Sequence, residues 1–110
     1  MSTARTDRLP GTLDLLVLRI LASEPLHGWA IAQRMQDVSR DVLTVGQGSL
    51  YPALYRLEEA GAIEADWQVS EAGRRARVYR LTKEGHRQLD RERTSWKEFT
   101  AAVARVLQFA

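Results

Sequence analysis

Cysteine is absent from all 110 residues of the sequence. Disulfides, thiolate catalysis and Cys-based zinc or iron–sulfur sites are therefore excluded, which fits a reducing cytoplasm. The sequence also lacks any run of about 18 apolar residues, so no membrane-spanning helix is expected. The N-terminal stretch MSTARTDRLPGT has no apolar segment of the kind that secretory signals carry. We expect a cytoplasmic protein with no membrane partner.

Histidine is scarce as well, with His27 and His86 far apart in the sequence and no acidic cluster near either. No metal site is expected. The short GQG at residues 46–48 lacks the length and the lysine of a phosphate-cradling loop. Glu58 and Glu59 are neighbours on a predicted helix and point in different directions, so they make a poor acid–base pair. We expect neither an enzyme nor a bound cofactor.

The chain is long enough for one domain with its own core. Its net charge of +2 is modest, but the charge is unevenly distributed. Residues 74–83, RRARVYRLTK, contain five basic residues and no acidic one. This segment is the strongest positive feature of the sequence.

Helical periodicity predicts a first helix over residues 12–23 and a second over residues 28–38. The first helix has apolar residues on two sides, because Leu15 and Leu18 lie away from its main apolar face. A helix that is apolar over so much of its circumference should be buried on both sides. We expect a second subunit to pack against its second apolar side. The second helix should turn Ile31, Ala32 and Met35 inward.

A third helix is predicted within GQGSLYPALYRLEEAGAI, residues 46–63, where the inward residues are Leu50, Ala53, Leu54 and Leu57. Pro52 lies among them. Proline is tolerated only in the first turn of a helix, so we predict that this helix begins near Ser49 with Gly48 or Ser49 as its cap. Gly61 is a plausible stop at its end.

The segments around this helix predict a small amount of β structure. Residues 42–45 are predicted as a short strand within a connector. Ile63, Ala65, Trp67 and Val69 alternate with polar residues, which indicates a half-buried strand, and residues 78–81 form the returning strand after a polar turn over 70–76. The order of elements is that of a winged helix-turn-helix, with a mainly α fold and one small β hairpin.

The last helix should begin after Thr82, a good N-cap, and run to about Gln108. A seven-residue spacing joins Leu89, Trp96 and Val103, and Phe99 and Val106 take the companion positions of a coiled-coil seam. Glu92 and Gly85 interrupt this seam at earlier positions. The domains expected are an N-terminal, partly ordered arm over 1–8, a winged helix-turn-helix over 9–82, and a dimerisation helix over 83–110. The dimer interface is expected to consist of Leu15, Leu18, Leu89, Trp96, Phe99, Val103 and Val106.

Three segments in order, LHGWAIAQRM, GQGSLYPALYRLEEAGAI and RRARVYRLTKEG, resemble the PadR family of bacterial transcriptional regulators over roughly residues 9–90. The single C-terminal helix is similar to that of the small subfamily. Trp29 departs from the tyrosine most often expected at its position, but keeps an aromatic ring. The resemblance implies a homodimer that binds an inverted-repeat operator in double-stranded DNA, usually as a repressor released by a small ligand or a stress signal.

A recognition helix enters the major groove with its N-terminal residues nearest the bases, and its amides favour phosphate. We expect Gln47 and Ser49 to bond bases or phosphates, and Arg56 and the tyrosine hydroxyls to contact phosphates. The residues of this helix expected at DNA are Gln47, Gly48, Ser49, Tyr51, Pro52, Tyr55 and Arg56. An ordinary solvated face, with the tyrosines packed on neighbours, is the alternative.

The arginines of the wing are expected at its tip, where Arg74, Arg75 and Arg77 reach phosphates or an adjacent minor groove. Alone, such a turn is most often only solvated. Tyr79 and Leu81 should point into the core and Arg80 outward.

Trp96 has two interpretations. A tryptophan on a seam is most often dimer core. In some small members of the family, however, paired tryptophans sandwich flat aromatic ligands, so the resemblance makes Trp96 a candidate pocket residue, together with Leu15, Leu18 and Phe99. At the level of function, the alternatives to a repressor are an activator that uses the same DNA contacts and a winged-helix protein-interaction module.

Overall fold

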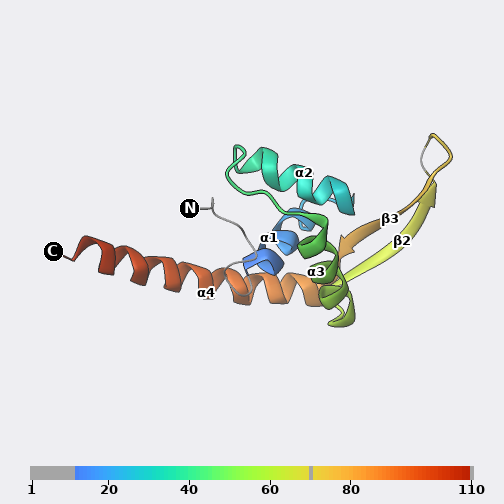
Figure 1. Cartoon of the computed structure of the whole chain (residues 1–110). Helices are drawn as coiled ribbons and strands as arrows, with labels where there is room; N and C mark the ends of the chain where they lie inside the picture. The colour runs from blue at the N-terminus through green and yellow to red at the C-terminus, as the bar shows by residue number, and fades with distance from the viewer. Residues whose placement is uncertain (1–11, 70, 110) are drawn as a thin grey trace.

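The structure is a computed structural model that describes residues 12–69 and 71–109. The N-terminal arm expected over residues 1–8 lies outside these residues. Within them the elements are, in chain order, α1 (Thr12–Leu21), β1 (Leu26–His27), α2 (Gly28–Val38), α3 (Gln47–Glu59), β2 (Ile63–Val69), β3 (Arg75–Leu81) and α4 (Lys83–Gln108). Figure 1 shows three short helices gathered at the centre, the β2–β3 hairpin projecting from one end and α4 from the other. This is the predicted winged helix-turn-helix with a long C-terminal helix.

The core lies between the first three helices and the base of the hairpin. Apolar residues at helical spacing on α3 are all buried, as the sequence predicted. The largest fully buried side chains come from α1, α2, α3 and β2: Val17, Leu18, Ile31, Leu50, Leu54, Leu57 and Ile63. In the described part of the chain, no helix combines the length and the apolar character that crossing a lipid bilayer requires.

The sheet has the strand order β1-β3-β2, and all its pairings are antiparallel. The strand predicted over residues 42–45 is wrong, because only Thr44 there forms an isolated bridge. The third strand is instead β1, where Leu26 pairs with Tyr79 and His27 with Val78. Two residues are too few to show the alternation by which a strand is predicted.

The hairpin is longer and more exposed than predicted. Its ladder extends from Ile63 opposite Leu81 to Val69 opposite Arg75, so β3 begins three residues earlier than Val78. Ile63 is buried, but Trp67 and Val69 are exposed because this part of the strand extends beyond the helices. The prediction of a half-buried strand is therefore wrong for its distal half.

Helix α3 begins at Gln47, with Gly46 as its N-cap, rather than near Ser49. Pro52 is thus inside the second turn, where its missing N–H deprives the Gly48 carbonyl of a helical donor. Gly48 is exposed, so water can bond that carbonyl and the cost of the proline is reduced. Burial of four apolar residues on the inner face of the helix offsets the remaining free-energy cost of the proline.

The C-terminus of α3 confirms the predicted stop. Gly61 has a φ of +77°, the left-handed conformation that glycine adopts without strain. The Ala62 amide donates to the Leu57 carbonyl at 2.9 Å and the Gly61 amide to the Glu58 carbonyl at 3.0 Å. These are the two hydrogen bonds of a Schellman motif.

Helix α4 starts against this same turn. The Thr82 hydroxyl accepts a hydrogen bond from the Gly85 amide at 3.0 Å, which confirms the predicted N-cap. The Thr82 amide donates to the Ala62 carbonyl at 3.0 Å. Gly85 lies so close to the turn that a Cβ added there would be 2.1 Å from the Ala62 oxygen. The first turn of α4 is therefore fixed to the end of α3.

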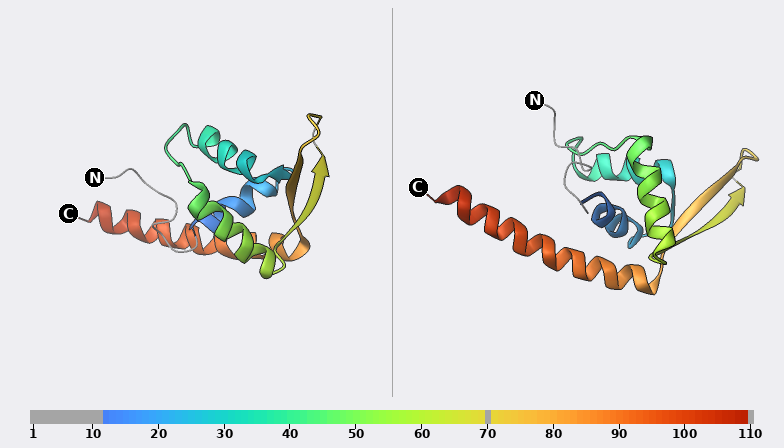
Figure 2. Two further views of the ribbon diagram at one scale, coloured as in Figure 1. Left: turned by 45° about the vertical axis from the view of Figure 1, so that its right-hand side comes forward. Right: turned by 60° about the horizontal axis from the view of Figure 1, so that its bottom comes forward.

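Beyond this point α4 runs under α1 and then leaves the rest of the molecule, as both views in Figure 2 show. Leu89 is almost fully buried, and Leu18 of α1 has no exposed surface, because both pack in the core of their own chain. The prediction that Leu18 and Leu89 face a second subunit is wrong for this reason, and so is the prediction that Leu18 lines a pocket. Further along α4, the large apolar residues Phe99, Val103, Val106 and Leu107 are exposed.

Replacing Gly85 tests the contact between α4 and the turn after α3. Gly85→Ala should lower the free energy of unfolding by roughly 1–3 kcal/mol, because the new methyl group meets a backbone oxygen and the Leu81 side chain. Thermal or denaturant unfolding measures the change. Gly48→Ala is the matched control, since nothing lies within 4 Å of its added Cβ. Equal melting curves for the two variants would contradict the close packing described above.

Candidate nucleic-acid interface

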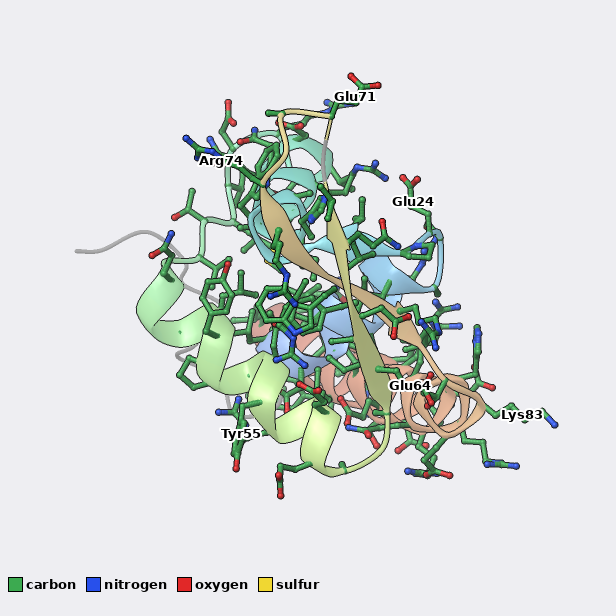
Figure 3. The ribbon with its side chains drawn as sticks, turned by 90° about the vertical axis from the view of Figure 1, so that its right-hand side faces the viewer. Glu24, Tyr55, Glu64, Glu71, Arg74 and Lys83 are labelled. Atoms are coloured by element: carbon green, nitrogen blue, oxygen red, sulfur yellow. The ribbon has the colours of Figure 1, made fainter. Side chains whose placement is uncertain are left out.

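The outer face of α3 presents polar and aromatic side chains. Gln47, Pro52 and Arg56 are exposed, and Tyr55 is 65% exposed. Figure 3 shows Tyr55 directed away from the rest of the domain. The inner face of the same helix is buried in the core. The outer face is therefore the one available for contact with another molecule.

The N-terminus of α3 has no side-chain cap. Gly46 has extended backbone angles and no capping side chain, and its carbonyl accepts from the Ser49 and Leu50 amides at 3.1 and 2.9 Å. The first amides of a helix carry its positive dipole end. Gly48 adds no side chain there, and nothing lies within 4 Å of the position its Cβ would take. This end of α3 is open and suited to an anion.

Tyr51 has a structural role in addition to its position on the outer face. Its ring covers Gly28, the first residue of α2, so closely that a Cβ at Gly28 would lie 2.7 Å from the Tyr51 hydroxyl oxygen. The side chain is still 40% exposed. Tyr51 therefore joins α2 to α3 and keeps part of its surface accessible.

Two ion pairs connect α3 to its neighbours. The Arg56 guanidinium donates to the Asp14 carboxylate of α1 at 3.0 Å, and Arg77 of β3 donates to Glu58 at 2.7 Å. Neither carboxylate was expected to take part in the site. Each pair joins residues far apart in sequence, so no local spacing signals it.

The arginines of the wing occupy different environments. Arg74 lies in the turn and is exposed, near the end of the hairpin where Figure 3 labels it beside Glu71. Arg75 is the first residue of β3 and is exposed, while Arg77 lies two residues further in and is half-buried. Arg74 and Arg75 thus lie at the distal end of the hairpin, where Arg75 pairs with Val69, the last residue of β2. The prediction of a wing-tip position is wrong for Arg77 only.

An exposed tryptophan accompanies these arginines. The Cζ atom of Arg75 is 4.7 Å from the centroid of the Trp67 ring, and that of Arg77 is 5.8 Å from it. Trp67 was expected to be buried, because it alternates in phase with Ile63 and Ala65. The structure places it among the wing arginines instead.

The remaining hairpin residues lie as predicted. Tyr79 is buried, and this burial raises its pKa above the ordinary value, with Arg77 opposing the shift. Arg80 points outward, where it bonds Glu64 at 2.7 Å and also pairs with Asp66. Arg80 is thus neutralised by two carboxylates on the opposite face of the wing.

The candidate pocket and seam residues lie on α4 and α1. Trp96 and Leu15 are partly buried, whereas Phe99, Val103 and Val106 are exposed. The rings of Trp96 and Phe99 are in contact, with their centroids 5.7 Å apart and their planes inclined by 39°. Among residues 12–69 and 71–109, no group of three or more His, Cys, Asp or Glu residues is arranged to hold a metal ion.

Comparison with known proteins identifies the family. The model of the transcriptional regulator PadR-like family matches residues 17–91. A protein from Mycobacterium tuberculosis named as a transcriptional regulator is 36% identical over 89 residues, which cover 81% of this chain and 79% of that protein.

Solved structures agree with this assignment. A PadR-like transcriptional regulator from Bacillus cereus has a TM-score of 0.79 at 27% identity, with 94% of this chain and 99% of that one covered. A PadR-like transcription factor from Bacteroides fragilis has a TM-score of 0.72 at 30% identity, with 87% and 90% covered. The chain therefore belongs to the PadR-like family of transcriptional regulators, which are DNA-binding proteins and not enzymes.

Proposed function

We propose that the chain is a homodimeric, sequence-specific regulator that acts in the cytoplasm as a repressor and leaves its operator in response to a small-molecule or stress signal. The observation that carries the proposal is the exposed polar face of α3 beside a projecting wing that bears arginines. Both elements lie on one side of the molecule, so a single duplex can contact both. In a two-fold dimer the operator is an inverted repeat, with half-site centres about one helical turn, or a multiple of it, apart.

Each element has its own part in DNA binding. The open N-terminus of α3 brings Gln47, Gly48 and Ser49 nearest to the base edges in the major groove. Tyr51, Pro52, Tyr55 and Arg56 lie along the walls of the groove, where hydroxyl and guanidinium groups meet phosphates. Arg74 and Arg75 on the wing add contacts to the backbone.

The first test separates base contacts from backbone contacts. Gln47→Ala should weaken binding to the cognate site by roughly 1–3 kcal/mol and relax preference at one symmetric base position. Arg75→Ala should act equally on cognate and random DNA. It removes two charges per dimer, so the slope of log K against log salt should flatten by up to about 2, at about 0.9 per phosphate contact.

A salt titration of the wild type and both variants, on the promoter of the protein's own operon and on random DNA, measures these effects. Wild-type protein that binds neither DNA would favour the alternative function, a protein-interaction module. An unchanged salt slope for Arg75→Ala would remove the wing from the interface.

Dimerisation is proposed through the second half of α4. Trp96, Phe99, Val103 and Val106 follow the alternating three- and four-residue spacing of a coiled-coil seam. Phe99 is 51% exposed and Val106 more so, although both are apolar. Leu15 of α1, a partly buried residue that packs against the core, is proposed as a further member of this interface. A matching helix from a second chain would remove these side chains from water.

The second test places a charge in this seam. Phe99→Asp should yield monomers or aggregates at micromolar concentration, because a buried carboxylate has no partner there. Ala101→Asp is the matched control, since it adds the same charge on the opposite side of the helix and should leave the dimer intact. Light scattering measures both. A monomeric wild type would refute the proposed dimer.

A ligand pocket is proposed where Trp96 meets its counterpart across the dimer axis, with Phe99 and Leu15 at its sides. The contact between the Trp96 and Phe99 rings supports an aromatic lining. Stacked aromatic rings favour flat aromatic compounds. Such a ligand would act on DNA binding through the relative position of the two subunits.

The third test follows tryptophan fluorescence. Planar aromatic compounds should quench the wild type and weaken its operator binding. Trp96→Ala should lose most of the quenching, and the compounds should no longer weaken its operator binding. Trp29→Phe and Trp67→Phe are the controls, because these exposed tryptophans contribute to the signal. Quenching that persists in Trp96→Ala would place the ligand elsewhere.

An activator would use the same DNA contacts, so none of these tests separates it from a repressor. A reporter gene under the protein's own promoter does so, since deletion of a repressor raises expression and deletion of an activator lowers it.

A further inference from the structure

Trp67 is 58% exposed although its indole is the largest apolar side chain on the wing. It lies directly opposite Arg77 in the hairpin, and Val69 lies opposite Arg75. Because side chains two residues apart share a face of a strand, Trp67, Arg75 and Arg77 project from the same face. Both guanidinium groups are within the roughly 6 Å at which a cation is attracted to an indole ring.

Arg75 is the nearer of the two cations. A guanidinium that lies over an aromatic face engages the ring with its own face, and its N–H groups remain directed outward from its edge. Phosphate is bound through this edge, commonly by two parallel hydrogen bonds. The indole therefore restricts the Arg75 side chain without using its donors, and less freedom is lost when a phosphate arrives.

Arg77 is held in a different way. Its guanidinium bonds Glu58 of α3 at 2.7 Å, and it also lies 5.6 Å from the centroid of the Tyr79 ring. Only 38% of its side chain is exposed. One of its N–H groups is bonded to the Glu58 carboxylate and its Nε atom is buried, so Arg77 presents fewer donors to a phosphate than Arg75 does. The pair also joins β3 to α3, the helix proposed to enter the major groove.

We propose that Trp67 is a positioning residue that presents Arg75 to a DNA phosphate, while Arg77 makes no phosphate contact and instead fixes the wing to α3 through Glu58. The inference rests on the proposed DNA-binding function and adds a division of labour among the wing arginines. The contacts described above connect four side chains into one group: Trp67, Arg75, Arg77 and Glu58.

The test of Trp67 is a double-mutant cycle with Arg75. Binding of a random-sequence DNA duplex is measured by fluorescence anisotropy for the wild type, Trp67→Leu, Arg75→Ala and the double variant. Trp67→Leu should weaken binding about two- to fivefold per wing, the range that corresponds to an exposed cation–π contact. In the Arg75→Ala background the same change should have no effect. Trp67→Tyr keeps an aromatic face and should restore most of the affinity.

The melting temperature of each variant shows whether folding is intact, and an exposed side chain should alter it little. A Trp67→Leu effect that is the same with and without Arg75 would show that the indole contacts DNA itself. Either that result or no effect of Trp67→Leu overturns the role of Trp67. A wild type that binds no duplex overturns the proposed function as well, so the two failures are distinguishable.

The test of Arg77 removes its ion pair without changing the net charge. Glu58→Gln combined with Arg77→Gln should leave the slope of log K against log salt at the wild-type value, because no phosphate contact is lost. Arg75→Ala in the same titration is the positive control for a lost contact. If the paired variant flattens the slope by up to about 2 per dimer, Arg77 contacts phosphate and its assigned role is wrong.

Discussion

The close approach of α4 to the turn after α3 determines how the parts of this molecule are arranged. The Ala62 carbonyl accepts the Thr82 amide, and Gly85 has no room for a side chain beside it. The end of α3, the base of the hairpin and the start of α4 therefore meet at one point. Because α4 is continuous from there over 26 residues, the direction of this proposed dimerisation helix is fixed relative to α3. The spacing of the two DNA-binding faces in a dimer follows from this contact.

Local chemistry made much of the fold predictable. The inward face of α3, the extent of α2, the glycine stop at Gly61 and the Thr82 cap all follow from patterns within a few residues of sequence. The sequence does not predict the start of α3, because the local penalty of Pro52 favours a helix that begins nearer to this proline. Tertiary packing and an exposed carbonyl made that penalty tolerable. Strand β1 was missed because its two residues are defined only by their pairing with β3.

The candidate site was predictable where it depends on one helix and unpredictable where two elements meet. Exposed residues of α3 followed from knowing which residues of that helix are buried. The sequence predicts that Leu18 and Leu89 pack against a second subunit, whereas both are buried in their own chain. A helical pattern shows that an apolar side chain must be buried, but not whether its own chain or a partner buries it. Trp67 has the spacing of a buried strand residue, yet its strand extends past the helices that would cover it. Asp14 and Glu58 carry no local signal at all.

The two ion pairs of α3 illustrate how weak contacts contribute to a site. Partly exposed pairs of this kind contribute about 0–1 kcal/mol each to stability, far less than the buried inner face of the helix. Their geometry is more informative than their energy. Arg56 reaches back to Asp14 on α1, and Glu58, two residues further on and so on a different side of the helix, reaches Arg77 on β3. Packing of the four buried residues of its inner face fixes α3 against the core. The two pairs add contacts from its outer sides to α1 and to the wing. In the proposed DNA complex these contacts keep the outer face of α3 and the wing in register on one duplex, so the pairs serve DNA recognition more than stability.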